Sequence, residues 1–347
     1  MRSIQHQRIE ISTVAGSEDN FTIQQLPLCT REQIRRGYWK PLQLSKPPYI
    51  SEEPWEKTCY LNNGSREGQL DGSPFHDWEW TVNIRTFNEE NGCFFGSFNV
   101  ERFCQLNINR TIAFLGDSIS WQQFNSLNLL IGAKDELRRK ELIKTDACDE
   151  RTKLVWMRDN HATAKGLSSI INLSDPDVIV LNRGAHYTNN TVLSMGLKTT
   201  LAKAFQWQQD CDERKDKRDC LLVWRTTAPG FPDCSHVPGP IGAGNQTDVE
   251  ALISNPLNPW YMENSKHREF HWWDFRDQNA LVENLIQNLV DAHPQFRISF
   301  IDFYEMAILR PDNHINARDC LHYCLPGPPD AANAVLLHHM EAAVFSQ

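Results

Sequence analysis

A serine placed directly after a predicted strand could act as a nucleophile. The run Thr111–Leu115 is apolar and partly β-branched; Gly116, Asp117 and Ser118 follow it, and residues 121–132 have a helical pattern. A serine at such a turn is exposed at the edge of a sheet, and the helix N-terminus offers backbone N–H groups and a favourable dipole to a developing anion. Alternatively, Asp117 or Ser118 only caps the helix. The G-x-S-x-G elbow is absent, which argues against an α/β-hydrolase fold.

A base for this serine could come from the C-terminal region. A serine nucleophile needs a base, and the base needs a carboxylate that fixes its tautomer. Asp319 and His322 are three positions apart, so one turn can place both side chains on the same side. Two alternatives remain open: Asp319 caps a turn beside a surface histidine, or Cys320, His322 and Cys324 form a zinc site, although no partner cluster with ligand spacing exists.

A third polar group follows another predicted strand. Asn182 and Gly184 come directly after the run that ends there, and His186 and Tyr187 follow them. Acyl transfer develops negative charge on a carbonyl oxygen, and preorganised donors at that oxygen are worth about 10²–10³ in rate each. The backbone N–H groups of Ser118 and Gly184, with the Asn182 amide, could form this oxyanion hole, although an ordinary strand-end turn explains the same residues.

The elements that must position these groups alternate between strands and helices. Five short apolar runs are typical of a parallel sheet covered on both faces: Thr111–Leu115, Lys153–Met157, Asp177–Asn182, Cys220–Arg225 and Arg297–Asp302. Helical patterns occupy about 121–132, 193–209, 277–292 and 329–343. This order predicts an α/β fold, a three-layer αβα sandwich with a central parallel sheet. The long irregular segments Ala228–Tyr261 and Arg310–Pro329 should emerge where the strands end, which is where ligands bind in open α/β sheets.

The N-terminal part differs in composition from the rest. We expect residues 1–25 to be polar and disordered, residues 26–108 to form a Cys- and Trp-rich, disulfide-bonded segment packed on the core, and residues 109–347 to form the catalytic domain.

Composition and charge exclude several classes. Of the 347 residues, 40% are hydrophobic and 23% charged, which is typical of a globular protein and excludes a disordered or fibrous chain. With 35 Lys+Arg and 44 Asp+Glu the net charge is −9, and no basic stripe for nucleic acid is present. The mixed-charge runs Lys134–Glu141 and Asp212–Asp219 are interpreted as solvated helix faces or loops.

Ten cysteines without a C-x-x-C pair favour disulfide bonds and a secretory protein. Six N-x-S/T sequons agree: Asn20, Asn63, Asn109, Asn172, Asn189 and Asn245. Asn109 lies close to the predicted buried strand Thr111–Leu115, which argues against it as an acceptor. The N-terminus has no apolar signal region, and no apolar stretch is long enough to span a membrane. Two expectations remain. Either a signal or anchor lies upstream, outside this chain, and directs the protein to the Golgi lumen, or the protein is cytosolic and its cysteines are reduced.

The motifs together resemble the trichome birefringence-like/PC-esterase family, polysaccharide O-acetyltransferases and esterases of the SGNH (GDSL) hydrolase superfamily. The resemblance covers about residues 29–343 and is most specific at the C-terminal motif. The matching residues are Cys29, Gly37-Tyr38-Trp39, Pro48-Tyr49, Cys59, Trp78-Glu79-Trp80, Phe98 to Phe103, Gly116-Asp117-Ser118, Gln123, Ser126-Leu127, Asn182-x-Gly184, His186, Arg225-Thr226-Thr227-x-Pro229, Arg310-Pro311-Asp312-x-His314, Asp319-Cys320-x-His322-x-Cys324-Leu325-Pro326-Gly327, Pro329-Asp330 and Asn333.

The resemblance implies an SGNH-like fold and a role for each of three residues. Ser118 would be the nucleophile, His322 the general base and Asp319 its partner; acetyl would pass from a donor to Ser118 and then to a sugar hydroxyl. Plant relatives usually have a basic residue where this chain has Trp121, and Ala185 interrupts their usual Gly-His-Trp. Both departures argue against a plant-type acceptor such as xylan.

Further expectations concern binding and disulfides. We expect substrate contacts from Asp117, Trp121, His186, Tyr187, Arg225, Arg310 and His314. The two long loops should meet, which predicts a Cys234–Cys320 bridge; we also expect Cys324 to pair with the N-terminal region and Cys211 with Cys220. No metal or bound cofactor is implied, and the acetyl donor would be a co-substrate.

Three functions remain open. The first is an O-acetyltransferase acting on a glycan, the second an acetylesterase with the same three residues, and the third an inactive glycan-binding protein. Aromatic residues between Trp39 and Trp80 and in His271-Trp272-Trp273 could stack on sugar rings, although such residues are more often core.

Overall fold

The computed structural model describes most of the chain. The described residues are 27–42, 47–51, 59, 78–82, 92–139, 141–214, 220–234, 239–242, 245–263, 268–316 and 319–345. The predicted disorder of residues 1–25 and the sequons at Asn20 and Asn63 lie outside these ranges. In the described part, no helix is both long and apolar enough to cross a membrane.

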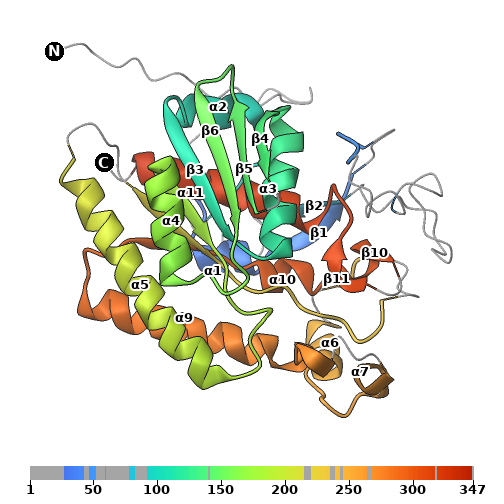
Figure 1. Ribbon diagram of the computed structural model, residues 1–347. Coiled ribbons are helices and arrows are strands. Elements are labelled where there is room, and N and C mark those ends of the chain that lie inside the picture. Colours follow the sequence, from blue (N-terminus) through green and yellow to red (C-terminus); the bar gives the residue numbers. More distant parts are fainter. Residues whose placement is uncertain are drawn as a thin grey trace.

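A mixed sheet forms the centre of the molecule (Figure 1). The strand order is β4-β5-β6-β3-β7-β8-β9; β6, β3, β7, β8 and β9 are parallel, whereas β5 is antiparallel to both of its neighbours. The bounds are β3 Arg110–Gly116, β4 Lys134–Arg139, β5 Leu142–Ala147, β6 Thr152–Arg158, β7 Val178–Leu181, β8 Leu221–Arg225 and β9 Ile298–Ile301. All five predicted strands are present, so the α/β class is confirmed, with the antiparallel β4–β5 pair added to the parallel sheet.

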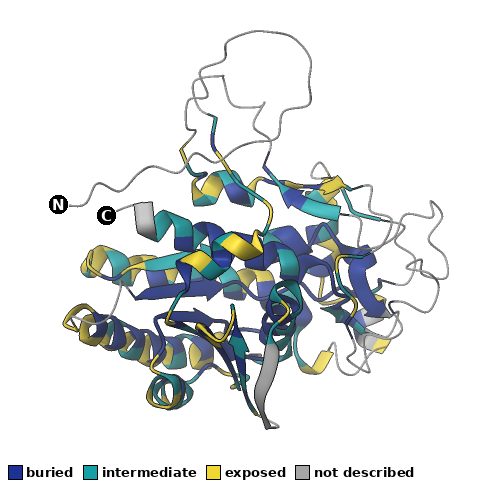
Figure 2. Cartoon of the chain, turned by 90° about the horizontal axis from the view of Figure 1, so that it is seen from above, coloured by how far each residue is buried: buried dark blue, intermediate teal, exposed yellow. Residues whose placement is uncertain are grey.

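Alternate residues of each central strand face different helical layers. In β3, Ile112 and Phe114 pack with α3 and α11, whereas Ala113 and Leu115 pack with α4, α5 and α9. Because both faces are covered, the strands need the near-continuous apolar runs seen in the sequence. Figure 2 shows buried strands between helices whose outer faces are exposed. The three-layer sandwich is thus confirmed, with helices α3 Ser118–Ile131, α4 Ala164–Ser174, α5 Asn190–Asp212, α9 Phe275–Ala292, α10 Phe303–Ala307 and α11 Pro328–Phe345.

Two elements of the core domain differ from the sequence interpretation. The charged run Lys134–Glu141, interpreted as a helix face or loop, contains strand β4, which lies at the edge of the sheet and pairs with β5. Charged side chains suit an edge strand because they oppose pairing with another molecule. Helix α4 was not predicted, since Gly166 and several serines give it low helix propensity; a side-chain cap from Thr163 and packing against α5 stabilise it.

The described N-terminal residues pack on this core, in α1 Arg31–Arg35, β1 Tyr38–Pro41, β2 Trp78–Thr81 and α2 Val100–Leu106. Trp39 donates from Nε1 to the carbonyl of Met306 at 2.8 Å, and Arg31 forms an ion pair with Asp302 at 2.6 Å. Strands β1 and β2 form a separate antiparallel pair. This region therefore packs against the residues that follow β9.

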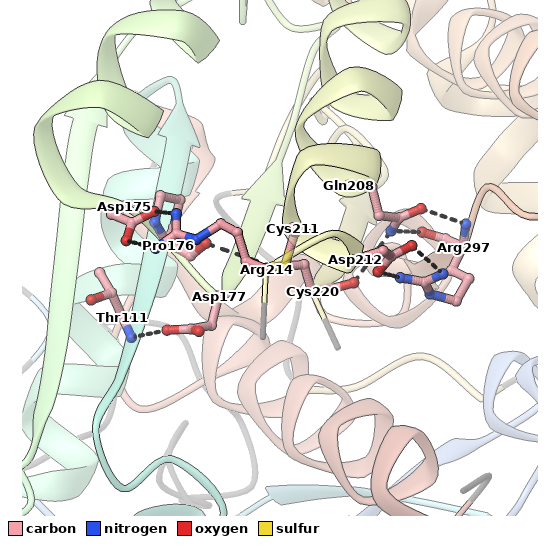
Figure 3. The surroundings of a disulfide bond; sticks show 10 residues. All are labelled: Thr111, Asp175, Pro176, Asp177, Gln208, Cys211, Asp212, Arg214, Cys220 and Arg297. Atoms are coloured by element: carbon pink, nitrogen blue, oxygen red, sulfur yellow. Dashed lines mark hydrogen bonds and ion pairs between the residues drawn. A yellow bond between two sulfur atoms is a disulfide. The ribbon is translucent and has the colours of Figure 1, made fainter. Parts of the chain in front are cut away.

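A disulfide and an ion pair join helix α5 to the strands at the amino edge of the sheet (Figure 3). Cys211, in α5, pairs with Cys220, which directly precedes β8, as predicted. Next to this disulfide, Asp212 accepts two hydrogen bonds from the Arg297 guanidinium at 2.6 and 3.0 Å. These contacts join the C-terminal end of α5 to the starts of β8 and β9, at the edge opposite to the strand C-termini.

The two long irregular segments converge at the carboxyl edge, as expected. Cys234 of the first pairs with Cys320 of the second, and the Phe231 N–H donates to the Cys320 carbonyl at 3.0 Å. Cys324 pairs with Cys59 of the N-terminal region, which confirms that prediction too. The short elements of this edge are α6 Gln246–Ile253, α7 Pro259–Glu263, η4 Trp272–Asp274, η5 Pro311–Asn313, β10 His314–Asn316 and β11 Asp319–Tyr323. The remaining pairs are Cys29–Cys93 and Cys104–Cys148.

Candidate active site

The turn between β3 and α3 presents Ser118 at the first position of the helix. Asp117 is the N-cap: its carboxylate accepts hydrogen bonds from the N–H groups of Ile119 and Ser120 at 3.0 and 3.2 Å. A Cβ atom on Gly116 would lie 2.7 Å from the Ser120 Cβ, so only glycine fits this turn. The sheet neighbours of β3, β6 and β7, extend away on opposite sides, so Ser118 lies at the topological switch point of the sheet.

Three side chains form a chain of hydrogen bonds. His322 Nε2 lies 2.7 Å from Ser118 Oγ, although the two residues are 204 positions apart. His322 Nδ1 lies 2.9 Å from each carboxylate oxygen of Asp319. This arrangement keeps Nδ1 protonated and leaves the Nε2 lone pair to accept the serine proton, which is the geometry a serine nucleophile and its base require.

The Asp319 carboxylate is held in its charged form. Burial alone would raise its pKa, but the hydrogen bonds and charge of His322, with a smaller contribution from His314, outweigh burial and hold the pKa of Asp319 well below its usual range. The carboxylate therefore stays ionised throughout the neutral range and faces the imidazole as an anion.

The hairpin of β10 and β11 holds the histidine in place. His314, fully buried, stacks on Tyr323 and lies with Nδ1 3.0 Å from the His322 carbonyl. One disulfide starts from Cys320 within β11 and another from Cys324 directly after it, so both ends of the segment that carries His322 are covalently anchored. Since both sulfurs are oxidised, the alternative zinc site does not form. In the described part of the chain, no group of His, Cys, Asp or Glu residues could hold a metal ion.

Gln122 is a residue that the sequence did not reveal as part of this site. Its Nε2 donates to the Tyr323 carbonyl at 2.6 Å, and its Oε1 accepts from the Tyr323 N–H at 3.0 Å. The amide thus pairs with the backbone of β11 like an extra strand and ties the residue after His322 to the helix that begins at Ser118. Because a backbone partner has no side-chain signature, no spacing rule could have found this contact.

We expect Gln122→Met to lower kcat about ten- to a hundredfold with little change in KM, because a small displacement of His322 misaligns the proton transfer. Methionine preserves the side-chain volume but leaves the peptide groups of Tyr323 unpaired. Gln123→Met is the matched control: Gln123 is equally buried, and neither of its amide atoms has a partner among the described residues. Steady-state kinetics and the rate of labelling of Ser118 by a fluorophosphonate test this; equal losses in both variants would contradict a positioning role.

Several residues expected to touch substrate lie beneath the site instead. The five with almost no exposed surface are Asp117, Tyr187, Arg225, Arg310 and His314. Arg225 Nη2 is 3.7 Å from the Asp117 carboxylate, and burial lowers the pKa of Arg225 to about 10, although Asp117 acts to raise it. Arg310 forms a buried ion pair with Asp312 at 2.9 Å. The substrate-contact prediction is therefore revised for these five, because their side chains are buried rather than exposed to a ligand.

The two other expected contacts keep exposed surface. Trp121 is partly exposed and packs against Trp156 and Phe124, with ring centroids 5.1 and 5.6 Å away. His186 is also partly exposed; burial lowers its pKa, Asp117 acts to raise it, and the positive charges of His161, Arg158 and His322 lower it further. His186 is thus within electrostatic range of the hydrogen-bonded chain.

The expected oxyanion residues lie at the ends of β7 and β8. The buried Asn182 amide donates from Nδ2 to the Arg225 carbonyl at 3.0 Å and lies 3.4 Å from Thr227 Oγ1, so it bridges the two strand ends. Gly184 leaves room for Thr227, whose Oγ1 would be 2.0 Å from a Cβ atom there. A role for the Asn182 amide and the N–H groups of Ser118 and Gly184 in binding an oxyanion stays a prediction.

Comparisons with known proteins agree with the motifs. Residues 261–339 match the PC-Esterase family, described as a GDSL/SGNH-like acyl-esterase family found in Pmr5 and Cas1p. This range contains Asp319 and His322 but not Ser118. The chain is 22% identical to xyloglucan O-acetyltransferase 3 of Populus trichocarpa, over 89% of this chain and 86% of that protein.

Two Arabidopsis thaliana proteins are similar to the same extent. Protein trichome birefringence-like 6 is 22% identical over 96% of this chain and 74% of its own length, and protein trichome birefringence-like 9 is 22% identical over 81% and 76%. The resemblance indicated by the motifs is thereby confirmed: this chain is similar to the trichome birefringence-like proteins, and its C-terminal region matches the PC-esterase family.

Proposed function

We propose that this protein is a serine-dependent O-acetyltransferase that moves acetyl groups onto carbohydrate hydroxyls. The observation that carries the proposal is the continuous hydrogen-bonded chain from Ser118 through His322 to Asp319. The name of the Populus relative supports a polysaccharide acceptor, and the PC-esterase match supports acyl chemistry.

The reaction would proceed in two half-reactions. In the first, His322 Nε2 takes the Ser118 proton while Oγ attacks the acetyl carbonyl of the donor; the tetrahedral intermediate collapses, the bond to the donor breaks, and the departing donor oxygen or sulfur takes the proton from His322. In the second, His322 takes the proton of a sugar hydroxyl as that oxygen attacks acetyl-Ser118, and then returns the proton to Ser118 Oγ. Asp319 stabilises the imidazolium that forms in each step.

Negative charge on the carbonyl oxygen needs donors in both steps. We propose the backbone N–H groups of Ser118 and Gly184 for this role. The α3 N-terminus supports it, because its positive end faces an anion at Ser118. The buried Arg225 guanidinium adds a positive charge behind Asp117. The Asn182 amide, expected as a third donor, already donates to the Arg225 carbonyl and to Thr227 Oγ1, so we assign it to holding the loop that carries Gly184.

A hydrolytic acetylesterase is the second candidate, because water can attack acetyl-Ser118 in place of a sugar. The two activities separate in one assay: the protein is incubated with an acetylated donor in the presence and absence of oligosaccharide, and both acetate and acetylated sugar are quantified. We expect acetylated sugar to exceed free acetate when the oligosaccharide is saturating. Acetate alone at every acceptor concentration would establish the esterase, and neither product would favour the inactive glycan-binding protein.

We also propose that the protein works in the secretory pathway, in the Golgi lumen, and is glycosylated. Five disulfides support an oxidising compartment. The sequons at Asn109, Asn172, Asn189 and Asn245 are all exposed, so their asparagines are accessible. Asn109, which the sequence argued against, adopts a positive φ of 57° in the turn before β3, and this turn directs it to the surface.

A further inference from the structure

Three aromatic rings from three different segments meet at the carboxyl edge of the sheet, the edge at which β3 ends in the turn that carries Ser118. His186 follows β7, His161 follows β6, and Phe270 precedes η4. The His186 ring lies 5.3 Å from Phe270 and 6.2 Å from His161, with interplanar angles of 79° and 64°. His161 is exposed and the other two are partly exposed, so all three reach the surface.

Two of the segments that carry these rings are hydrogen-bonded to the end of β3, directly before the turn that carries Ser118. The Asp159 N–H, at the start of the segment that contains His161, donates to the Gly116 carbonyl at 3.0 Å. The Asn182 N–H, at the start of the segment that contains His186, donates to the Leu115 carbonyl at 3.3 Å. Both segments therefore flank the end of β3, one on each side.

The segment that presents His161 is held unusually firmly for a surface loop. The Asp159 carboxylate accepts from the N–H groups of His161 and Thr163 at 3.0 and 2.8 Å and from the Thr163 hydroxyl at 2.7 Å. Tyr187 donates from its hydroxyl to the His161 carbonyl at 3.2 Å. Ala162, buried, adopts a φ of 41°, a left-handed conformation that costs energy for a non-glycine residue.

Buried donors hold this strained residue in place. The Ala162 carbonyl accepts from Arg183 Nη1 at 3.2 Å and from the Thr200 hydroxyl at 2.9 Å. Gly196 makes room for the guanidinium, because a Cβ atom there would lie 1.7 Å from Arg183 Nη2. Strain that the surrounding structure maintains is typical of functional sites, and here the strained residue directly follows the exposed His161.

We infer that His161, His186 and Phe270 form the binding platform for the sugar unit that accepts the acetyl group. This inference rests on the proposed function and names a part of the acceptor site. Phe270 offers apolar ring surface to the C–H face of a pyranose, and a neutral imidazole offers one donor and one acceptor to its hydroxyls. Burial keeps His186 neutral at lower pH than usual, because it lowers the pKa.

Binding is measured in a Ser118→Ala background, so that no acetyl chemistry intervenes. The probes are neutral xyloglucan, xylan and mannan oligosaccharides, titrated by calorimetry. We expect at least one oligosaccharide to bind. We expect its affinity to fall at least tenfold in at least one of the two variants His161→Ala and Phe270→Ala. His293→Ala is the matched control, since this partly exposed histidine also contacts an aromatic ring, 5.0 Å away at Phe205, but lies between α9 and β9, towards the amino edge of the sheet.

The active chain gives a second, independent readout. There, His161→Ala should raise KM for the bound oligosaccharide and leave hydrolysis of 4-nitrophenyl acetate nearly unchanged. The inference is overturned if no oligosaccharide binds, or if affinity and KM stay at their reference values in both platform variants. If the variants lose binding while the unmodified protein neither transfers nor hydrolyses acetyl groups, the platform stands and the proposed enzyme activity fails.

Discussion

Replacing Ser118 by Ala is expected to lower kcat for acetyl transfer and hydrolysis by about 10⁴- to 10⁶-fold, the range found when a nucleophile is removed from a group of residues that act as a unit. The substitution removes Oγ, the atom 2.7 Å from His322 Nε2. No covalent intermediate can then form, and only the contribution of substrate binding and oxyanion stabilisation remains. Initial rates with an acetylated donor measure the effect.

A second serine in the same helical turn provides the control. Ser120 is buried against Gly116 and faces the turn rather than the imidazole, so Ser120→Ala should keep most of the activity. Both variants should unfold at about the temperature of the unmodified protein. If Ser118→Ala were as active as Ser120→Ala, Ser118 would not be the nucleophile.

Replacing Asp319 by Asn is expected to lower kcat by about 10⁴-fold, the size of effect measured for the equivalent change in a serine protease. The carboxylate accepts the Nδ1 proton of His322 and so leaves Nε2 free for the serine proton. An amide can donate to Nδ1 instead, which favours the wrong tautomer and removes the negative charge that stabilises the imidazolium. Asp212→Asn, an exposed change at the opposite edge of the sheet, should have little effect on the rate.

The same substitution predicts a change in acid stability. The pKa of Asp319 is lower in the folded protein than in the unfolded chain, so its charge stabilises the fold above the unfolded pKa, and this contribution is lost as the pH falls towards the folded value. The midpoint temperature of unfolding should therefore fall more steeply below about pH 4 in the unmodified protein than in Asp319→Asn. Parallel curves for the two proteins would show that the interaction with His322 does not stabilise the folded state.

The sequence predicted that Ser118 and His322 would lie close together, because their motifs were expected at the same edge of the sheet. The apolar run before Gly116 locates the turn that carries Ser118, and the Cys234–Cys320 pair follows from two loops that emerge at the same edge. These inferences need only the order of the elements and the rule that parallel strands end at one edge of a sheet.

Other features depend on packing that no local pattern encodes. The amide of Gln122 binds the backbone of Tyr323, and a backbone group is present at every residue, so no residue type or spacing in the sequence identifies this partner. Arginines are usually exposed, yet Arg225 and Arg310 are buried, where each lies near a carboxylate: Asp117 for Arg225 and Asp312 for Arg310. Strand β4 is charged because it lies at an edge, and composition alone made it look like a solvated helix face or loop.

The most direct test of the account is to look for the acetyl-enzyme. The protein is mixed with an acetylated donor, quenched in acid within one turnover, digested and analysed by mass spectrometry. An added acetyl group on the peptide that contains Ser118, absent from the His322→Ala variant and removed when an oligosaccharide is added before the quench, is the predicted result. Rapid turnover with no acetyl on that peptide at any quench time, or acetyl accumulating on another residue, would contradict catalysis by Ser118.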